Sequence, residues 1–144
     1  MDFASVSAIS ASGMDVESAR LNAAAINLAN IHTSRSAEGG PFKPLRVVSG
    51  THSPFGKHLH SAAMAQFPAA AVVSVERTSL APRLVHEPGH PDADAKGFVA
   101  YPGIDSVSEM VGLMTAVRAY EANVIALNAA KAMATRALEI GSAS

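Results

Sequence analysis

The chain has 144 residues, a length that suits one domain with or without long extensions. Its 11 Lys and Arg residues nearly balance its 12 Asp and Glu residues, so the net charge gives no reason to expect nucleic acid as a partner. The absence of cysteine excludes disulfides, thiolate metal ligands and cysteine nucleophiles. Alanine supplies 29 of the hydrophobic residues, and alanine buries little area, so we do not expect a large core.

The first region, residues 1–34, is expected to be a helical segment, with the helix itself over residues 3–31. Residues 3–31 contain no proline, one glycine and many alanines, which favour helix. Met14, Leu21 and Leu28 recur every seven residues and give the helix an apolar stripe.

Two kinds of membrane-directed segment are not expected. No Lys or Arg precedes Arg20 and no compact apolar run occurs near the N-terminus, so a cleavable secretory signal peptide is not predicted. No uninterrupted run of 18 apolar residues occurs, so we expect no membrane-spanning helix and no membrane insertion.

The middle region, residues 35–104, holds all eight prolines, and a β-rich structure is predicted for it. A loop is expected over Gly50 to Phe67, which is rich in His, Ser and Ala. Four short segments contain Val and are bounded by Pro, Gly or Ser, so they indicate a small antiparallel β element. These segments are Leu45 to Ser49, Ala71 to Glu76, Arg83 to His86 and Gly97 to Tyr101.

The last region, residues 105–144, gives the clearest helical pattern. After a Pro102-Gly103 turn, Ser106 and Glu109 fit a capping box. Gly141 stands where a glycine that ends a helix is expected, so the predicted helix covers residues 105–140.

This helix carries a heptad pattern in which eight of nine positions are apolar. A helix of about 36 residues is roughly 54 Å long and cannot be buried within so small a globule. Its apolar seam therefore needs the N-terminal helix, other subunits or both. The expected fold is α+β, with two long terminal helices in a coiled-coil-like hairpin and a small β-rich middle. The seam positions are Met110, Val117, Val124, Lys131 and Leu138 in one register, and Leu113, Tyr120, Leu127 and Ala134 in the other.

One segment, His86-Glu87-Pro88-Gly89-His90, matches the H-E-x-x-H pattern of zinc hydrolases. That pattern works on a helix, which brings both histidines and the glutamate to one face. Pro88 and Gly89 forbid this helix, so a turn-rich loop with two exposed histidines is the favoured interpretation. A small zinc-dependent hydrolase using His86, Glu87 and His90 stays as the alternative from another class.

Other metal patterns are weaker. Asp92 to Gly97 imitates the start of a calcium-binding loop, but Lys96 stands at a ligand position and turns explain the segment better. His52, His58 and His60 lack nearby carboxylates and are expected to be surface histidines. No phosphate-binding or nucleophile motif occurs. We therefore assign no catalytic residue, no metal and no cofactor.

Asparagine is unusually frequent in both predicted helices, although it is a poor helix former. Its amide can fix the register between packed helices. It can equally lie solvated on an outer face, and the sequence leaves both interpretations open. The residues concerned are Asn22, Asn27, Asn30, Asn123 and Asn128.

Three stretches resemble a known family. The run from Arg20 to Asn30 resembles the N-terminal signature of bacterial flagellar axial proteins, which include rod and hook proteins. The run from Thr115 to Val124, with Leu127, Asn128 and Lys131 after it, resembles their C-terminal signature. The segment from Leu84 to Pro102 and the Gly39-Gly40-Pro41-Phe42 run resemble the proximal-rod members of the flagellar basal-body rod protein family.

This resemblance implies a structural subunit and not an enzyme. It implies export by the flagellar type III apparatus without a cleavable signal, followed by polymerisation into the torque-transmitting rod that spans the periplasm. The implied partners are other rod subunits and copies of the chain itself, with a contact near the inner-membrane ring at the rod base. The terminal helices would form the D0-type inner layer of such a rod.

The expected assembly interface combines the apolar seam positions with the asparagines of both helices. A small secreted helical-hairpin adaptor, stable as a soluble monomer or dimer, is the alternative. The interface residues are Met14, Leu21, Asn22, Asn27, Leu28, Asn30, Met110, Leu113, Val117, Tyr120, Asn123, Val124, Leu127, Asn128 and Leu138.

Overall fold

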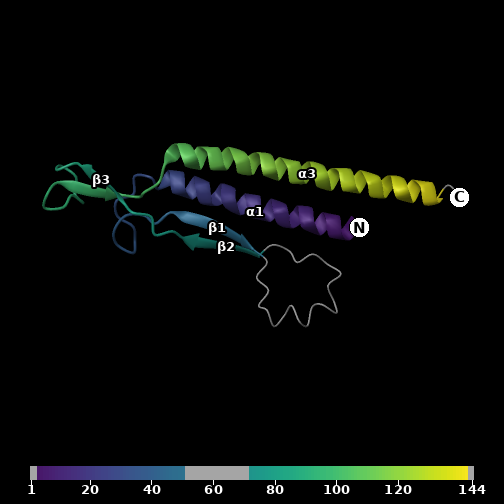
Figure 1. The fold of residues 1–144 in the computed structure, drawn as a ribbon, viewed down its shortest axis with the longest axis horizontal. Helices are drawn as coiled ribbons and strands as arrows, with labels where there is room; N and C mark the ends of the chain where they lie inside the picture. Colours follow the sequence, from purple (N-terminus) through teal and green to yellow (C-terminus); the bar gives the residue numbers. More distant parts are fainter. Residues whose placement is uncertain (1–2, 51–71, 143–144) are drawn as a thin grey trace, which may run out of the picture.

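The computed structural model describes residues 3–50 and 72–142. Two long helices lie side by side, and the N-terminal end of the first lies at the same end of the molecule as the C-terminal end of the second (Figure 1). The α+β class is therefore confirmed. In chain order the elements are α1 (Phe3–Ala29), β1 (Leu45–Gly50), β2 (Val72–Arg77), β3 (Arg83–His86), β4 (Phe98–Tyr101) and α3 (Ser106–Ser142).

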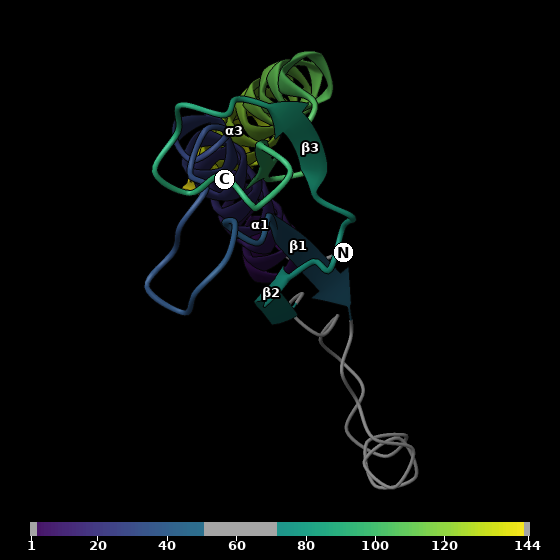
Figure 2. The ribbon, with the colours of Figure 1, turned by 90° about the vertical axis from the view of Figure 1, so that its left-hand side faces the viewer.

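The layers follow from which elements α1 contacts. It packs against α3 on one side and against β1 and β2 on the other, and both views show this order (Figures 1 and 2). The hairpin of β3 and β4 lies at the end of the molecule where α1 ends and α3 begins (Figure 1). Most of the predicted loop over Gly50 to Phe67, with His52, His58 and His60, lies outside the described residues.

α1 ends at Ala29, two residues before the predicted end, and local hydrogen bonds explain the difference. The backbone N–H of Asn30 donates to the carbonyls of both Ile26 and Asn27, which tightens the last turn. The side-chain amide of Asn30 also donates to the Ile26 carbonyl, at 2.9 Å. Thr33 Oγ1 donates to Asn30 Oδ1 at 3.1 Å and holds this amide in place. Asn30 thus supplies a C-terminal cap and does not fix a helix register.

The N-terminal cap of α3 is Asp105, so the predicted capping box of Ser106 and Glu109 is wrong. One oxygen of Asp105 accepts from the backbone N–H of Ser108 at 3.1 Å and from its hydroxyl at 2.6 Å. The other oxygen accepts from the N–H of Val107 at 3.4 Å. These hydrogen bonds from Ser108 and Val107 lower the pKa of Asp105, because they favour its charged form. A carboxylate one residue earlier therefore occupies the position assigned to Ser106.

The helix was predicted to end at residue 140, with Gly141 just beyond it, but α3 continues to Ser142. A methyl group added at Gly141 would meet no atom within 4 Å, and no positive φ marks this residue as a terminating glycine. The helix therefore continues through a glycine that has open space around it.

The strands form two separate two-stranded antiparallel sheets and not one β element. In the first, Leu45 lies opposite Arg77 and Gly50 lies opposite Val72. In the second, Arg83 lies opposite Tyr101. The predicted bounds of β3 are confirmed, and the other strand bounds differ by one residue at one or both ends.

The core is small, as the alanine content predicts. The buried apolar side chains of the two helices are mainly alanines, Ala23 and Ala24 from α1 and Ala116 and Ala130 from α3. A second buried cluster lies in the β3–β4 hairpin, where Val99 is fully buried. Small side chains let the helix axes approach closely, but they contribute little buried area.

α3 is also long and apolar enough, by length and composition, to cross a membrane. Its most apolar 18-residue window has a mean hydropathy of 1.2. The expectation of no such segment was based on uninterrupted apolar runs, and a window average tolerates the polar residues that interrupt them. Alone, this property is weak evidence for a membrane.

Candidate assembly surface

The residues of α3 that pack on α1 are shifted by one residue along the chain from the first of the two predicted registers of the seam. Buried and half-buried side chains recur along α3 at spacings of three and four residues. This face includes most of the second predicted register of the seam. The other positions on the face are occupied mainly by small or polar residues. The positions are Glu109, Leu113, Ala116, Ala119, Asn123, Leu127, Ala130 and Ala134, with exposed Tyr120 at the margin.

The other predicted register is mostly exposed. Met110 and Leu138 are 57% and 75% exposed, Lys131 is exposed, and Val124 is half-buried. The seam was expected to pack on the N-terminal helix, on other subunits or on both, and within the described chain this register contributes little to the contact with α1. The contact with α1 is made instead through Ala116 and Ala130, whose small size permits close packing.

The exposed side of α3 carries an apolar strip near the start of the helix. Its members are spaced so that they share one face, and the first four are more than half exposed. Contiguous exposed apolar surface of this kind marks an interaction site. We call these residues the outer stripe: Val107, Met110, Val111, Met114 and Val117.

The predicted interface residues of α1 are distributed over different surroundings. Met14, Leu21 and Leu28 are half-buried, and Asn22 is exposed. On α3, Asn128 is exposed as well. The predicted interface residues therefore differ in burial from one another.

Asn27 joins α1 to β1. Its Nδ2 donates to the Leu45 carbonyl at 3.0 Å, and its Oδ1 accepts from the Leu45 N–H at 2.8 Å. Asn27 is 2% exposed, so these two bonds satisfy a buried amide and both backbone groups of Leu45. Neither interpretation of Asn27 made from the sequence was correct, because its partner is the backbone of a strand.

Asn123 packs against Gly13 across the helical pair. A methyl group added at Gly13 would lie 2.9 Å from both amide atoms of Asn123. Asn123 Nδ2 donates to the Ala119 carbonyl of its own helix at 3.0 Å, which satisfies one of its two N–H groups. Asn123 is therefore the one of these asparagines that lies in the contact between the helices.

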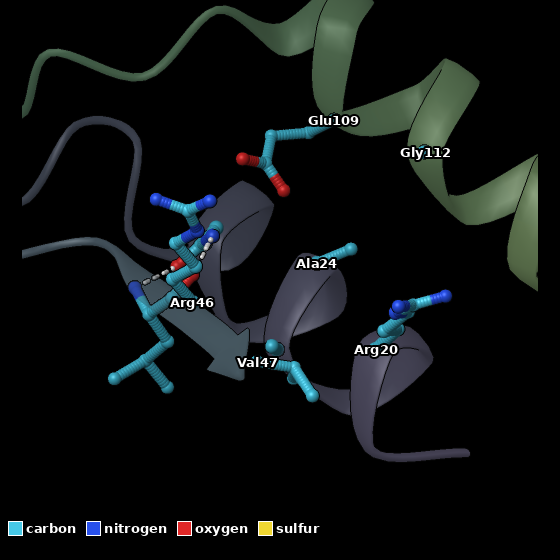
Figure 3. A pocket seen from close by; sticks show the side chains of 9 residues that line it. Arg20, Ala24, Arg46, Val47, Glu109 and Gly112 are labelled. Carbon is cyan, nitrogen blue, oxygen red and sulfur yellow. Dashed lines mark hydrogen bonds between the residues drawn. The ribbon is translucent and has the colours of Figure 1, made fainter. Parts of the chain in front are cut away.

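A groove opens between α1, β1 and the first turns of α3 (Figure 3). Its volume is about 210 Å³. Arg20, Arg46 and Glu109 supply charges around it, and Arg20 also pairs with Glu17 at 2.7 Å. We call this the interhelix groove, and its lining residues are Arg20, Ala23, Ala24, Asn27, Leu45, Arg46, Val47, Glu109 and Gly112.

The H-E-x-x-H segment forms part of the loop between β3 and β4. Glu87 accepts a hydrogen bond from the Tyr101 hydroxyl at 2.9 Å, and this bond raises the pKa of Tyr101. His90 Nδ1 accepts from the backbone N–H of Asp92 at 3.1 Å. The ring of His86 packs on Phe98 with centroids 5.1 Å apart.

The polar atoms of Glu87 and His90 therefore have structural partners, and the His86 ring is held by packing. Within residues 3–50 and 72–142 no group of three His, Cys, Asp or Glu side chains could hold a metal ion. The zinc-hydrolase alternative thus finds no site in the part of the chain that is described.

The calcium-like segment is also structural. Asp94 Oδ1 accepts from the N–H groups of Lys96 and Phe98, both at 2.8 Å, and shapes the turn into β4. Asp92 pairs with Arg35 at 3.0 Å and accepts from the Ser34 hydroxyl at 2.8 Å. Asp92 thus ties the β3–β4 loop to the segment after α1, a contact between distant residues that no sequence pattern indicated.

Comparison with known proteins identifies the family. Residues 95–140 match the family model described as "Flagellar basal body rod FlgEFG protein C-terminal". The flagellar basal-body rod protein FlgC of Escherichia coli O157:H7 is 38% identical over 133 residues, which cover 92% of this chain and 93% of that protein. FlgC of Bacillus subtilis is 36% identical over 92% of this chain and 94% of its own. FlgC of Aquifex aeolicus is 36% identical over 96% and 97%, respectively.

These relatives span nearly the whole chain, and their names describe parts of the flagellar basal body. The buried alanine contact, the outer stripe and the structural roles of Glu87 and Asp92 fit a protein that assembles and does not catalyse. The chain belongs to the FlgC family of flagellar basal-body rod proteins, structural components of the flagellum and not enzymes.

Proposed function

We propose that the chain is a subunit of the proximal rod that polymerises with other rod subunits and with copies of itself through its two terminal helices. The observation that carries this proposal is the outer stripe of α3, which has no partner within the described chain. Each of its aliphatic side chains contributes roughly 1 to 2 kcal/mol when most of its exposed surface is removed from water. Five such side chains on one face give neighbouring subunits a favourable contact.

Coiled-coil-like packing between subunits is part of this proposal. The contact between α1 and α3 uses one face of α3, and the outer stripe lies on another. A second helix packed on that stripe would bury α3 on two sides. Repeated around an axis, this contact gives a layer of helices that can transmit torque.

Export by the flagellar type III apparatus is also proposed. The small alanine-rich core favours it, because a chain that buries little large apolar surface is easily kept unfolded before assembly. The contact with the rod base near the inner-membrane ring is proposed from the family resemblance alone.

The test compares two substitutions on neighbouring exposed residues of α3. Met114→Asp places a charge in the outer stripe, whereas Thr115→Asp places the same charge about 100° away around the helix. Both are introduced into a strain that lacks its own copy of the gene. Swimming in soft agar, export of the chain and its amount in isolated basal bodies are measured.

Met114→Asp should be exported but absent from basal bodies, and the cells should not swim. Thr115→Asp should restore swimming close to the level of the unchanged chain. Normal swimming with Met114→Asp would refute assembly through the outer stripe, and failure of the unchanged chain to enter basal bodies would refute the rod function.

A further inference from the structure

The last turns of α3 extend past the described start of α1. The two helices run antiparallel, with Gly13 opposite Asn123. After Asn123, α3 continues for 19 residues, but only 10 described residues of α1 precede Gly13. The difference of nine residues corresponds to an overhang of about 14 Å.

Apolar side chains stand on this overhang. Leu138 and Ile140 are 75% and 76% exposed, the highest values among the large hydrophobic residues described. Leu138 follows Ala134 by four residues, so it continues the side of α3 that faces α1. It is exposed because the described part of α1 does not extend far enough to cover it.

The interhelix groove lies toward the other end of the helical pair, and its floor is apolar. Ala23, Ala24 and Val47 line it, and a methyl group added at Gly112 would meet no atom within 4 Å. A cavity of about 150 Å³ holds a benzene ring, so a groove of this volume has room for a branched aliphatic side chain. Arg46 at its rim is exposed and would attract a nearby carboxylate.

We propose that the α3 overhang of one copy, with Leu138 as its anchor, docks in the interhelix groove of a second copy. This deepens the proposed function and rests on it, because it names the partner and the surface of an assembly contact. Leu138 would enter the space beside Gly112. Glu139, next in sequence, would bring a carboxylate near Arg46.

The two surfaces are different and lie toward opposite ends of the same molecule, so the contact is head-to-tail. A head-to-tail contact leaves one groove and one overhang unused at the ends of every chain of copies. Such a contact does not close on itself unless its rotation forms a ring, and it otherwise extends into a helical filament.

Disulfide cross-linking tests this contact, and the natural absence of cysteine makes the test clean. Gly112→Cys and Leu138→Cys are combined in one full-length chain and oxidised mildly, both in purified concentrated protein and in isolated basal bodies. The two positions are 26 residues apart on one helix, about 39 Å. Because a disulfide joins Cα atoms only about 4.4–6.8 Å apart, any bond between them must join two copies.

The expected result is a ladder of cross-linked dimers and larger species, in which peptide mass identifies a disulfide between position 112 of one copy and position 138 of another. Each single variant should remain monomeric under the same conditions. Gly89→Cys with Leu138→Cys is the matched control, because Gly89 also has open space around it but lies in the β3–β4 loop.

A second pair of variants tests the groove without cysteine. Gly112→Leu should fill the groove and lower self-association about tenfold, whereas Gly112→Ala should leave self-association nearly unchanged. Circular dichroism of both variants checks that the helices remain folded.

The outcomes separate the two proposals. If the chain restores swimming but forms no ladder, or if position 112 cross-links only to a different protein, docking of a second copy is wrong and the rod function stands. If the unchanged chain does not enter basal bodies, the rod function itself is wrong.

Discussion

Gly13 of α1 lies against the side-chain amide of Asn123 of α3, so closely that a single added methyl group would come within 2.9 Å of its nitrogen and its oxygen. Glycine in the middle of a helix destabilises it by about 1 kcal/mol relative to alanine. The space that glycine leaves is filled by the asparagine of the other helix. This pair therefore fixes both the separation and the register of the two helices at this level.

The first prediction concerns the energetic coupling of Gly13 and Asn123. Gly13→Ala alone should give little or no gain in stability, because the contact with the amide offsets the improved helix propensity. In an Asn123→Ala background the same substitution should stabilise by about 1 kcal/mol, because the obstructing amide is gone. Urea unfolding followed by far-ultraviolet circular dichroism measures both effects.

Gly112→Ala is the matched control for this pair. It also replaces a glycine within a helix, but its added methyl group meets no atom within 4 Å. It should stabilise by about 1 kcal/mol in both backgrounds. Equal effects of Gly13→Ala in the two backgrounds would show that Gly13 and Asn123 are not in contact.

The second prediction concerns the anchoring of β1 by Asn27. Asn27→Ala leaves the N–H and the carbonyl of Leu45 without their side-chain partner in a buried setting. The expected loss in the free energy of unfolding is about 2 kcal/mol. Asn22→Ala, an exposed position on the same helix, should change stability by less than about 0.5 kcal/mol. Equal losses would mean that Asn27 does not hold the strand.

The third prediction concerns stability at acid pH. The pKa of Asp105 is lowered in the folded chain, so its ionised form stabilises the start of α3. This contribution is complete above its ordinary pKa of 3.8 and is lost as the pH falls through the lower value of the folded state. The difference in melting temperature between the unchanged chain and Asp105→Asn should therefore be largest near neutral pH and shrink below pH 4.

Glu38 titrates in the same acid range, because its ion pair with Arg77 lowers its pKa as well. For this reason the informative quantity is the difference between the unchanged chain and Asp105→Asn, in which the contribution of Glu38 cancels. A difference that does not vary between neutral pH and pH 3 would contradict the role of Asp105.

The fourth prediction concerns the H-E-x-x-H segment. Elemental analysis of the purified chain should find no stoichiometric zinc, and His86→Ala and His90→Ala should leave metal content and swimming unchanged. The physical reason is that Glu87 accepts from Tyr101 and His90 accepts from Asp92, so the three side chains do not converge on one point. If the unchanged chain held one equivalent of zinc and the His90→Ala variant had lost it, the prediction that this segment binds no metal would be refuted.

The sequence predicted the elements well wherever a pattern is local. The strand from Arg83 to His86 has the predicted bounds, since turn residues flank it on both sides. Both helices were found because alanine and the heptad spacing reach across many turns. The start of α3 was assigned to the wrong cap because Asp105 and Ser106 both have side chains that suit that position.

Contacts between distant residues could not be predicted in this way. The amide of Asn27 lies on a helix and its partner Leu45 begins a strand, and no spacing rule connects them. The heptad pattern did not indicate which seam positions pack within the chain: Met110 and Leu138 are exposed, whereas the close contact with α1 is made by Ala116 and Ala130. The side of α3 that packs on α1 therefore combines small residues with Leu113 and Leu127 of the predicted seam.

The alanine-rich contact between α1 and α3 also bears on how the chain responds to heat and denaturant. The heat capacity change and the denaturant dependence of unfolding both scale with the surface newly exposed to water. Where the buried side chains of the two helices are alanines such as Ala24, Ala116 and Ala130, little apolar surface is exposed when the helices separate. The stability curve of the isolated chain should therefore be shallow.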